Sequence, residues 1–491
     1  MLPTEFAAFD AASIAALVRS REVSPVEVIE AAIAAMERLD PELHAFCTPA
    51  TDQARADARR LETRIRRGET VGPLAGVPVG IKDLILTRGI RTTFGSRLYA
   101  DYVPQEDDVA VERLRAADAI ILGKTNAAEF GYGGFGHNPL FPTTRNPWNT
   151  AMTPGGSSAG SGAAVAAGIV PIALGSDGGG SVRLPAAFCG LVGIKPTMGR
   201  IPVWPGCRDA SLPGVSGWES IEHYGPITRT VADAALMLAV MCGPDARDRW
   251  SLPDEGLRWT EAVTRRPPAN LSIAWCPRWG EQPVEPEVLA IAEKAARKLA
   301  DGIGATLEET ASPFGDIIEA DRAIVALETD LTGLRRLAKG HEETLTDSLH
   351  GLLARTWRAE EFTDAITVRK AAVADMVRFM ERYDLLLTPT APVTAFRVDH
   401  DGPGTIAGEP VSDDAWSPCL YPANLTGQPA ASVPAGWTSD GLPVGLQIMG
   451  RRLADEAVVT AAAAYERLAP WHTRYPPTSV WQMPDRTAPV A

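Results

Sequence analysis

Short, uninterrupted apolar runs alternate with segments of helical periodicity from Pro73 onward. Runs of strand length occur at 77–81, 119–122, 172–174, 191–194, 271–274 and 385–387. An apolar run without polar alternation is typical of a strand that is covered on both faces of a sheet. Helical segments at 158–168, 230–241 and 285–301 separate many of these runs. The alternation predicts an α/β fold in which helices sandwich a mostly buried sheet.

The two remaining long segments have a different pattern. Residues 1–70 are predicted to be a helical N-terminal arm packed on the core. Ser24 is followed by Pro25 and, three residues after the serine, by Glu27, which is the pattern of a helix N-terminus with a capping box. Residues 313–383 are rich in charge and mainly helical, and we interpret them as a helical insertion. We expect residues 71–491 to form one domain around that insertion.

Composition excludes several classes of protein. Hydrophobic residues make up 45% and charged residues 22% of the 491 positions, which is typical of a globular chain rather than a disordered one. The formal net charge of −14 disfavours binding to phosphate backbones, so we expect no nucleic-acid partner. The 6 cysteines form no CxxC pair, and the 7 histidines show no helical-turn spacing. We therefore expect neither a metal site nor a disulfide scaffold.

The sequence also lacks the usual signals for export and membrane insertion. The N-terminal residues MLPTEFAAFD show no basic region followed by an apolar run. The longest nearly apolar stretch, residues 163–175, is broken by Pro171 and is shorter than the roughly 20 residues of a membrane span. We expect a cytoplasmic protein with no membrane segment.

Residues 153–200 contain the densest motif signal, because two Gly/Ser loops flank a small-residue helix and a strand there. The first loop, 155–158, reads GGSS, and the second, 176–181, reads SDGGGS. Glycine-rich turns let several backbone N–H groups converge on one anion. The loops alone therefore predict either a phosphate site or a site for an oxyanion.

Three specific alternatives fit the sequence poorly. Lys124 follows a glycine as in a P-loop, but Asp118 stands where that motif requires another glycine. No GxGxxG opens a helix after the first strand, which disfavours a dinucleotide fold. Ser158 is the serine of a GxSxG match, yet polar and proline-broken residues 146–154 precede it where a nucleophile elbow needs a strand.

The order of motifs along the chain resembles the amidase signature family of serine hydrolases. The matching segments are GVPVGIKD at 76–83, GKTNAAEF at 123–130, TTRNPWN at 143–149, the Gly/Ser block, GPITRTVADAA at 225–235, LLLTPTAP at 385–392, NLTGQPAASVPAG at 424–436 and GLPVGLQIMG at 441–450. The resemblance implies a central mixed sheet sandwiched between helices. It also implies hydrolysis of amides or related acyl bonds without a cofactor.

The resemblance further implies a Ser–cisSer–Lys triad. The serine of DGGGSVR is Ser181, the expected nucleophile, and the first serine of GGSS is Ser157, the expected bridge with a cis peptide bond before it. The lysine of PVGIKD is Lys82, the expected base. A serine hydroxyl is a poor nucleophile until a base takes its proton, and burial in an apolar run would favour the neutral form of a lysine. Ser157 could then relay a proton and return it to the leaving nitrogen.

The family pattern also assigns supporting groups around Ser181. The implied oxyanion hole consists of the backbone N–H groups of Gly178, Gly179, Gly180 and Ser181. Asp177 and Arg183 fall at positions that would brace this loop. Ala159 and Ser176 depart from the commoner glycine and threonine, but neither departure removes a reacting group.

The substrate is less constrained by the sequence. Aromatic residues close to the motifs predict an apolar pocket for aryl or alkyl amides, although the same residues could simply pack in the core. The candidates are Phe135, Trp204, Trp218 and Tyr421. Carbamates (urethanes) and esters present a similar carbonyl to the same triad. The alternative is a glutaminase subunit of a tRNA-dependent amidotransferase, but residues 416–421 offer no acid to hold an α-amino group. A homodimer is compatible with a chain of this size.

Overall fold

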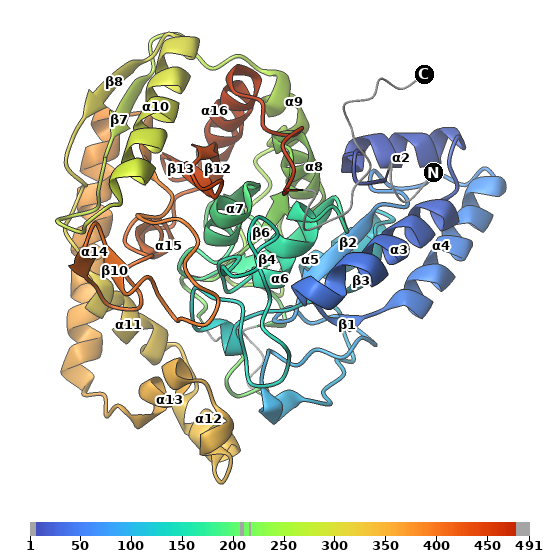
Figure 1. The fold of residues 1–491 in the computed structure, drawn as a ribbon, viewed down its shortest axis with the longest axis horizontal. Helices are drawn as coiled ribbons and strands as arrows, with labels where there is room; N and C mark the ends of the chain where they lie inside the picture. Colours follow the sequence, from blue (N-terminus) through green and yellow to red (C-terminus); the bar gives the residue numbers. More distant parts are fainter. Residues whose placement is uncertain (1–5, 207–210, 216–217, 478–491) are drawn as a thin grey trace.

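The computed structural model describes residues 6–206, 211–215 and 218–477. Within these ranges a sheet of 11 strands runs through the molecule in the order β1-β3-β2-β4-β6-β5-β12-β13-β9-β7-β8 (Figure 1). The strands are β1 (Phe46–Pro49), β2 (Pro78–Lys82), β3 (Ile120–Thr125), β4 (Ile172–Asp177), β5 (Val192–Lys195), β6 (His223–Thr228), β7 (Ser272–Trp275), β8 (Thr306–Glu309), β9 (Leu385–Pro389), β12 (Ala430–Trp437) and β13 (Pro443–Gly450). A small separate ribbon joins β10 (Thr405–Ile406) and β11 (Glu409–Pro410).

Helices surround this sheet. They are α2 (Ala11–Ser20), α3 (Pro25–Leu43), α4 (Thr51–Arg66), α5 (Val109–Ala116), α6 (Ala159–Ala166), α7 (Arg183–Cys189), α8 (Val231–Met241), α9 (Trp259–Thr264), α10 (Pro286–Ile303), α11 (Ile318–Leu327), α12 (Leu331–Ala338), α13 (Asp347–Ala354), α14 (Ala359–Arg382), α15 (Tyr421–Thr426) and α16 (Asp455–Leu468). Helices α8, α10 and α16 pack against the central strands, and α6 and α7 form a second packed group.

The sheet is mixed, as predicted. Strand β2 pairs in parallel with both β3 and β4, whereas β12 and β13 form an antiparallel pair that also joins β5 to β9. Every apolar run predicted as a strand overlaps one of β2, β3, β4, β5, β7 and β9. The predicted helices at 158–168, 230–241 and 285–301 correspond to α6, α8 and α10. The fold class predicted from the alternation is therefore confirmed.

The core lies between the strands and their covering helices. Ile121, Leu174 and Ile227 from the sheet are buried together with Leu238 of α8 and Val459 of α16. Removing this much apolar surface from water supplies the main driving force for folding, at roughly 25 cal/mol per Å². The same packing fixes β2 and β4 as rigid neighbours, so the residues at their carboxyl ends are held close together.

The N-terminal residues form helices α2, α3 and α4, and they also contribute strand β1 to the edge of the sheet beside β3. The capping box at Ser24 is confirmed, because its side chain accepts from the N–H of Val26 and the Glu27 carboxylate accepts from the N–H of Ser24. The side chain of Asp233 on α8 accepts a hydrogen bond of 3.0 Å from the N–H of Ala11. This bond ties the start of α2 to the core.

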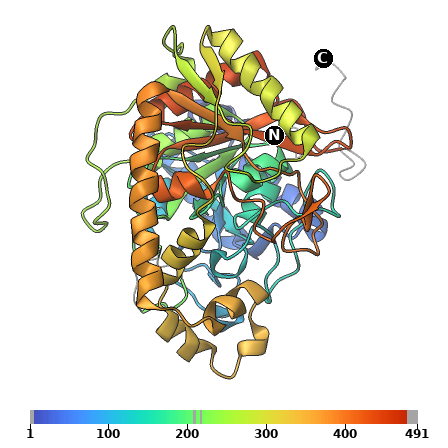
Figure 2. The ribbon, with the colours of Figure 1, turned by 90° about the vertical axis from the view of Figure 1, so that its left-hand side faces the viewer.

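Residues 318–382, here called the helical cap, contain α11, α12, α13 and α14. In Figure 2 the long α14 runs down one side of the molecule, and α12 and α13 lie at its lower end, away from α16. Leu334 of α12 and Leu349 of α13 are buried in one cluster with Phe94 and Phe130. The cap is thus packed against the motif loops between β2 and β4 rather than standing free.

Candidate active site

Lys82 is the last residue of β2, and its amino group is shut off from solvent. The Nζ atom donates hydrogen bonds to Ser157 Oγ at 2.8 Å and to Ser176 Oγ at 2.9 Å, and it lies 3.3 Å from the Ser176 carbonyl oxygen. Burial lowers the pKa of Lys82 to about 8, although the negative charges of Glu222 and Asp177 act to raise it. A lysine in this setting can lose its proton near physiological pH.

Ser157 lies in the loop before α6, and the peptide bond between Gly156 and Ser157 is cis. Only 1% of Ser157 is exposed. A Cβ atom on Gly156 would lie 2.2 Å from the carbonyl oxygen of Phe135, so only glycine fits this close backbone approach. The backbone of Gly156 packs directly against Phe135, and this contact fixes the position of Ser157, the next residue.

Ser181 lies in the loop that connects β4 to α7, and it lines a cavity that opens to solvent. Its exposed fraction is 8%, compared with 1% for Ser157. The N–H of Ser158, the residue after Ser157, donates to the carbonyl oxygen of Ser181 at 3.3 Å. This hydrogen bond joins the two Gly/Ser loops. The exposed fraction rises from Lys82 through Ser157 to Ser181, and Ser181 lines the cavity.

Asp177 organises the loop that carries Ser181. Its Oδ1 atom accepts from the N–H of Gly180 at 2.8 Å, and its Oδ2 atom accepts from the N–H of Val182 at 3.2 Å. Arg183 pairs with the same carboxylate at 2.9 Å, and both side chains are fully buried. Burial alone would raise the pKa of Asp177, but the Arg183 charge and the hydrogen bonds hold it well below its usual range.

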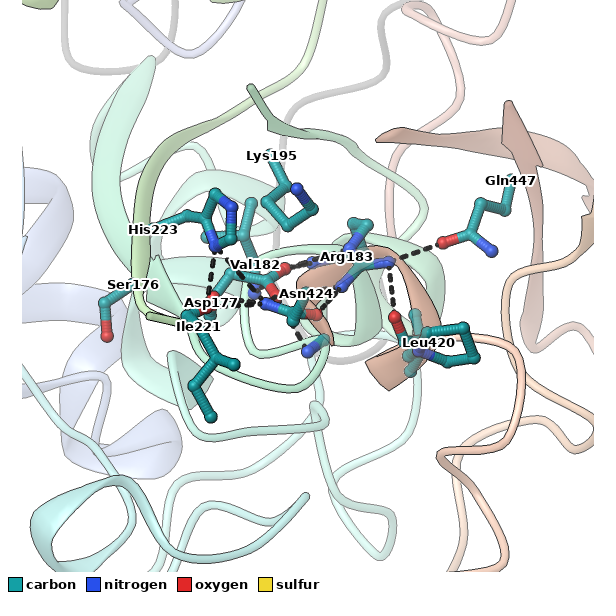
Figure 3. A network of polar contacts seen from close by, with 12 residues as sticks. Ser176, Asp177, Val182, Arg183, Lys195, Ile221, His223, Leu420, Asn424 and Gln447 are labelled. Carbon is teal, nitrogen blue, oxygen red and sulfur yellow. Dashed lines mark hydrogen bonds and ion pairs between the residues drawn. The ribbon is translucent and has the colours of Figure 1, made fainter. Parts of the chain in front are cut away.

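Two C-terminal elements hold this ion pair in place (Figure 3). Asn424 of α15 donates to the Asp177 carbonyl at 2.6 Å and to its Oδ1 at 2.9 Å, and it accepts from Arg183 at 2.6 Å. Arg183 also donates to Gln447 of β13 at 2.7 Å and to the carbonyl of Leu420 at 2.9 Å. The ion pair is thus fully hydrogen-bonded, which a buried pair of charges requires.

The predicted set of oxyanion-hole donors is wrong at Gly180. Its N–H is bound to Asp177, so it does not point into the cavity as the sequence prediction assumed. Gly178, Gly179 and Ser181 do line the cavity, and their N–H groups have no hydrogen-bond acceptor within the described ranges. Of the four predicted donors, these three are the ones without an acceptor in the described part of the chain.

Glu222 is a buried carboxylate beside Lys82 that the sequence analysis did not identify. The Ser176 hydroxyl accepts a hydrogen bond of 2.9 Å from Lys82, and this hydroxyl also acts to lower the pKa of Glu222. Burial raises the pKa of Glu222 to about 7, and the charge of Lys82 acts to lower it. Its Oε2 atom accepts no hydrogen bond from any described residue. Only the fold brings this residue, which directly precedes β6, to the end of β2.

The cavity next to Ser181 has a volume of about 440 Å³, the size of many small-molecule sites. Of the predicted aromatic residues, Phe135, Trp218 and Tyr421 line it. Trp204 does not; its carbonyl oxygen accepts from the N–H of Val109 at 2.8 Å, at the start of α5. The prediction for Trp204 followed from sequence proximity to the motifs, and the chain leads away from the cavity at that point.

Charged residues from the helical cap and from the 401–417 segment complete the cavity, and none of them was predicted. They are Asp321, Arg322, Arg355, Asp401, Asp413 and Asp414. These segments matched no motif, so only the folded chain reveals them as part of the site.

Cys189 is the last residue of α7, the helix that follows the Ser181 loop. Burial raises the pKa of the Cys189 thiol, and its sulfur donates to the carbonyl of Pro154, so we interpret it as a packed thiol. Among the described residues, no group of three or more histidine, cysteine, aspartate or glutamate side chains could hold a metal ion. No helix in these ranges has the length and apolar character to cross a bilayer.

Comparison with known proteins identifies the family to which the chain belongs. The family described as Amidase matches residues 27–459, and the chain belongs to this family, the amidase signature enzymes. It is a hydrolase of C–N bonds. An acylamidase of Rhodococcus erythropolis is 38% identical over 96% of this chain and 97% of that protein. The A-subunit of the glutamyl-tRNA(Gln) amidotransferase of Moorella thermoacetica is also 38% identical, over 94% of this chain and 97% of that protein.

Solved structures agree with this assignment. A bacterial aryl acylamidase of the amidase signature family has a TM-score of 0.87 and 34% identity, covering 98% of this chain and 99% of that chain. A 6-aminohexanoate cyclic dimer hydrolase, in complex with its substrate, has a TM-score of 0.83 and 29% identity, covering 96% and 99%. Proteins of this fold thus act on several different substrates, so the fold alone does not define the substrate of this chain.

Proposed function

We propose that this chain hydrolyses aryl and alkyl amides, and the related carbamates and esters, through an acyl-enzyme on Ser181. The observation that carries the proposal is the buried hydrogen bond of 2.8 Å between Lys82 and Ser157, next to the cavity that Ser181 lines. Neutral Lys82 takes the proton of Ser157, and Ser157 takes the proton of Ser181 as its oxygen attacks the carbonyl carbon.

The oxygen of the attacked carbonyl becomes negative in this step. The N–H groups of Gly178, Gly179 and Ser181 are the available donors, and a donor of this kind contributes about 3–4 kcal/mol in comparable sites. The C–N bond then breaks, and the proton held by Lys82 returns through Ser157 to the leaving nitrogen. Protonation matters here because an amine anion is a very poor leaving group. Water repeats the sequence on the acyl-enzyme and releases the acid.

The walls of the cavity support the substrate class. Trp218 and Tyr132 lie at a ring-centroid distance of 5.0 Å in an edge-to-face arrangement, and both line the cavity with Phe135 and Tyr421. Aromatic walls of this kind bury an aryl or alkyl group adjacent to the reacting carbonyl. The substrate is therefore proposed to be a small molecule, with no cofactor in the reaction.

The experiment is hydrolysis by the purified chain alone of 4′-nitroacetanilide, 4-nitrophenyl N-methylcarbamate and 4-nitrophenyl acetate. Ser181→Ala is the control variant. We expect turnover of at least the anilide, lost in the variant, and the order of rates then gives the preferred bond. Turnover that persists at the wild-type rate in the variant would contradict the proposal.

The second candidate is a glutaminase component of a tRNA-dependent amidotransferase. It is favoured by the 38% identity to the A-subunit of a glutamyl-tRNA(Gln) amidotransferase. It predicts that the chain releases ammonia from glutamine and needs partner proteins to do so efficiently. Ammonia release from glutamine without any anilide turnover would select this candidate over the first.

A further inference from the structure

Asp321 of α11 lines the same cavity as Ser181, and its side chain makes no hydrogen bond to any residue that the structure describes. Its Oδ1 atom is shut off from solvent and accepts nothing from any residue in the described ranges. A buried carboxylate oxygen without a donor is unfavourable in the free protein. The residue as a whole is partly exposed and lines a substrate cavity, so a ligand bound there can supply a donor to its carboxylate.

No cation in the described part of the chain forms an ion pair with Asp321. Arg369 donates to the carbonyl of Leu425 at 2.8 Å and to the Ser220 side chain at 2.6 Å. Arg322 is engaged by Glu319 and Asp414. Both guanidinium groups act to lower the pKa of Asp321, but burial outweighs them and raises it to about 7. The two cations that act on the pKa of Asp321 thus already have partners of their own.

The aromatic side chains in this part of the cavity are held in fixed positions. Thr329 follows α11, and its hydroxyl binds both the Trp218 Nε1 atom at 3.2 Å and the Tyr132 hydroxyl at 2.7 Å. The Tyr421 hydroxyl is likewise bound to Asp316 at 2.7 Å. The polar ends of these side chains are therefore occupied, and the rest of each ring is available to line the cavity.

A carboxylate without a donor, in the same cavity as fixed aromatic rings, matches one ligand chemistry. An ammonium group supplies N–H donors and positive charge to the carboxylate, and it is also attracted to aromatic faces. A carboxylate or phosphate group on the ligand would be repelled by the ionised Asp321 side chain. An uncharged alkyl group would leave Oδ1 without a donor.

We infer that Asp321 is a specificity residue that binds an ammonium group of the substrate, on the acyl part away from the bond that breaks. The substrate class is then amides of amino-substituted acids. This inference rests on the proposed function, since it places the acyl group of the substrate in the cavity of Ser181.

The test compares two series of 4-nitroanilides, one of ω-amino acids and one of the matching unsubstituted acids, with acyl chains of increasing length. Wild type is compared with Asp321→Asn, which keeps the shape and removes the charge. Asp413→Asn is the matched control, because Asp413 also lines the cavity but is exposed. Scanning the chain length finds the spacing between the ammonium group and the reacting carbonyl.

We expect wild type to prefer the amino series at least tenfold in kcat/KM at its best chain length. Asp321→Asn should remove most of this preference, mainly through KM, and should change the rate on the unsubstituted series less than twofold. Asp413→Asn should retain the preference. The inference is overturned if wild type shows no preference at any length, or if Asp321→Asn slows both series equally. It is also overturned if both variants lose the preference alike.

A binding measurement keeps the inference testable even if the chain turns over neither series. Calorimetric titration of Ser181→Ala with benzylammonium chloride, with benzyl alcohol as the uncharged probe, requires no catalysis. We expect binding of the ammonium that weakens at least fivefold when Asp321→Asn is added. Equal binding with and without that substitution would overturn the inference, whereas absent hydrolysis with intact ammonium binding would contradict only the proposed function.

Discussion

The amino group of Lys82 lies 2.8 Å from the hydroxyl oxygen of Ser157, and both side chains are buried. The surroundings offer this amine two hydroxyl groups and a carbonyl rather than a directly bonded carboxylate. These partners compensate only partly for the water that a charged amine loses on burial. Burial therefore lowers the pKa of Lys82 to about 8. A neutral amine thus becomes available next to a hydroxyl that can pass on its proton.

The first prediction concerns pH and Glu222. Lys82 acts as a base only when neutral, so kcat/KM should rise with pH and level off above about 8. The negative charge of Glu222 raises the lysine pKa, so Glu222→Gln should move the rising limb to lower pH. The measurement is the pH profile of kcat/KM for an anilide between about pH 5.5 and 10.

Glu466→Gln is the control for this profile, because Glu466 on α16 also has a pKa raised to about 7 by burial but does not act on Lys82. Its profile should match that of wild type. A rising limb that stays in place in Glu222→Gln, or moves equally in both variants, would show that Glu222 has no influence on the base.

The second prediction concerns the buried pair of Asp177 and Arg183. Asp177→Asn leaves the guanidinium without its counter-charge, which should lower the free energy of unfolding by about 3–5 kcal/mol at pH 7. The pKa of Asp177 is lower in the folded than in the unfolded chain, so its stabilisation is complete above the unfolded pKa and is lost as pH falls below about 4. Urea unfolding of wild type and variant from pH 7 to pH 3 should show the difference shrinking. A difference independent of pH would contradict this account.

The third prediction tests the space around the two loops. A Cβ atom on Gly156 would lie 2.2 Å from the backbone of Phe135, whereas one on Gly179 would find its nearest neighbour 3.9 Å away at Tyr421. We therefore expect Gly156→Ala to unfold at a clearly lower temperature, or to fail to fold, and Gly179→Ala to keep the wild-type melting temperature. Thermal denaturation followed by circular dichroism compares the pair, and equal melting temperatures would refute the close approach at Gly156.

The fourth prediction separates the two tryptophans that the sequence analysis had grouped together. Trp218 lines the cavity and Trp204 does not. Trp218→Ala should change the ratio of the rates on an anilide and on an aliphatic amide of the same acid at least several-fold. Trp204→Ala should leave that ratio unaltered, whatever it does to stability. A ratio that responds to Trp204 instead would place the substrate elsewhere.

The sequence was most informative where a residue's role depends on its own local pattern. The apolar runs predicted β2 and β4, and the resemblance led to Lys82 at the end of one and to Ser181 just after the other. It was less informative where a backbone turn decides which way an N–H group points. The N–H of Gly180 donates to Asp177, three residues earlier, whereas the N–H groups of Gly178, Gly179 and Ser181 have no acceptor among the described residues.

Residues from distant segments escaped prediction for a different reason. Glu222 and Asp321 stand in stretches without a motif, and only the packing of β6 and the helical cap brings them to the site. Similarly, β1 is short and lies within a helical segment, so nothing local indicated that it would pair with β3. The positions of Glu222, Asp321 and β1 depend on tertiary contacts, which no local sequence pattern indicates.

The most direct measurement of the central claim is the identity of the acylated residue. A slowly hydrolysed 4-nitrophenyl carbamate would be mixed with the chain, quenched in acid and analysed by intact mass and peptide mapping. We predict one added carbamoyl group on Ser181 in wild type, and none in Ser181→Ala. A modification on Ser157, Cys189 or any other residue that accounts for turnover, with Ser181 unmodified, would contradict the account.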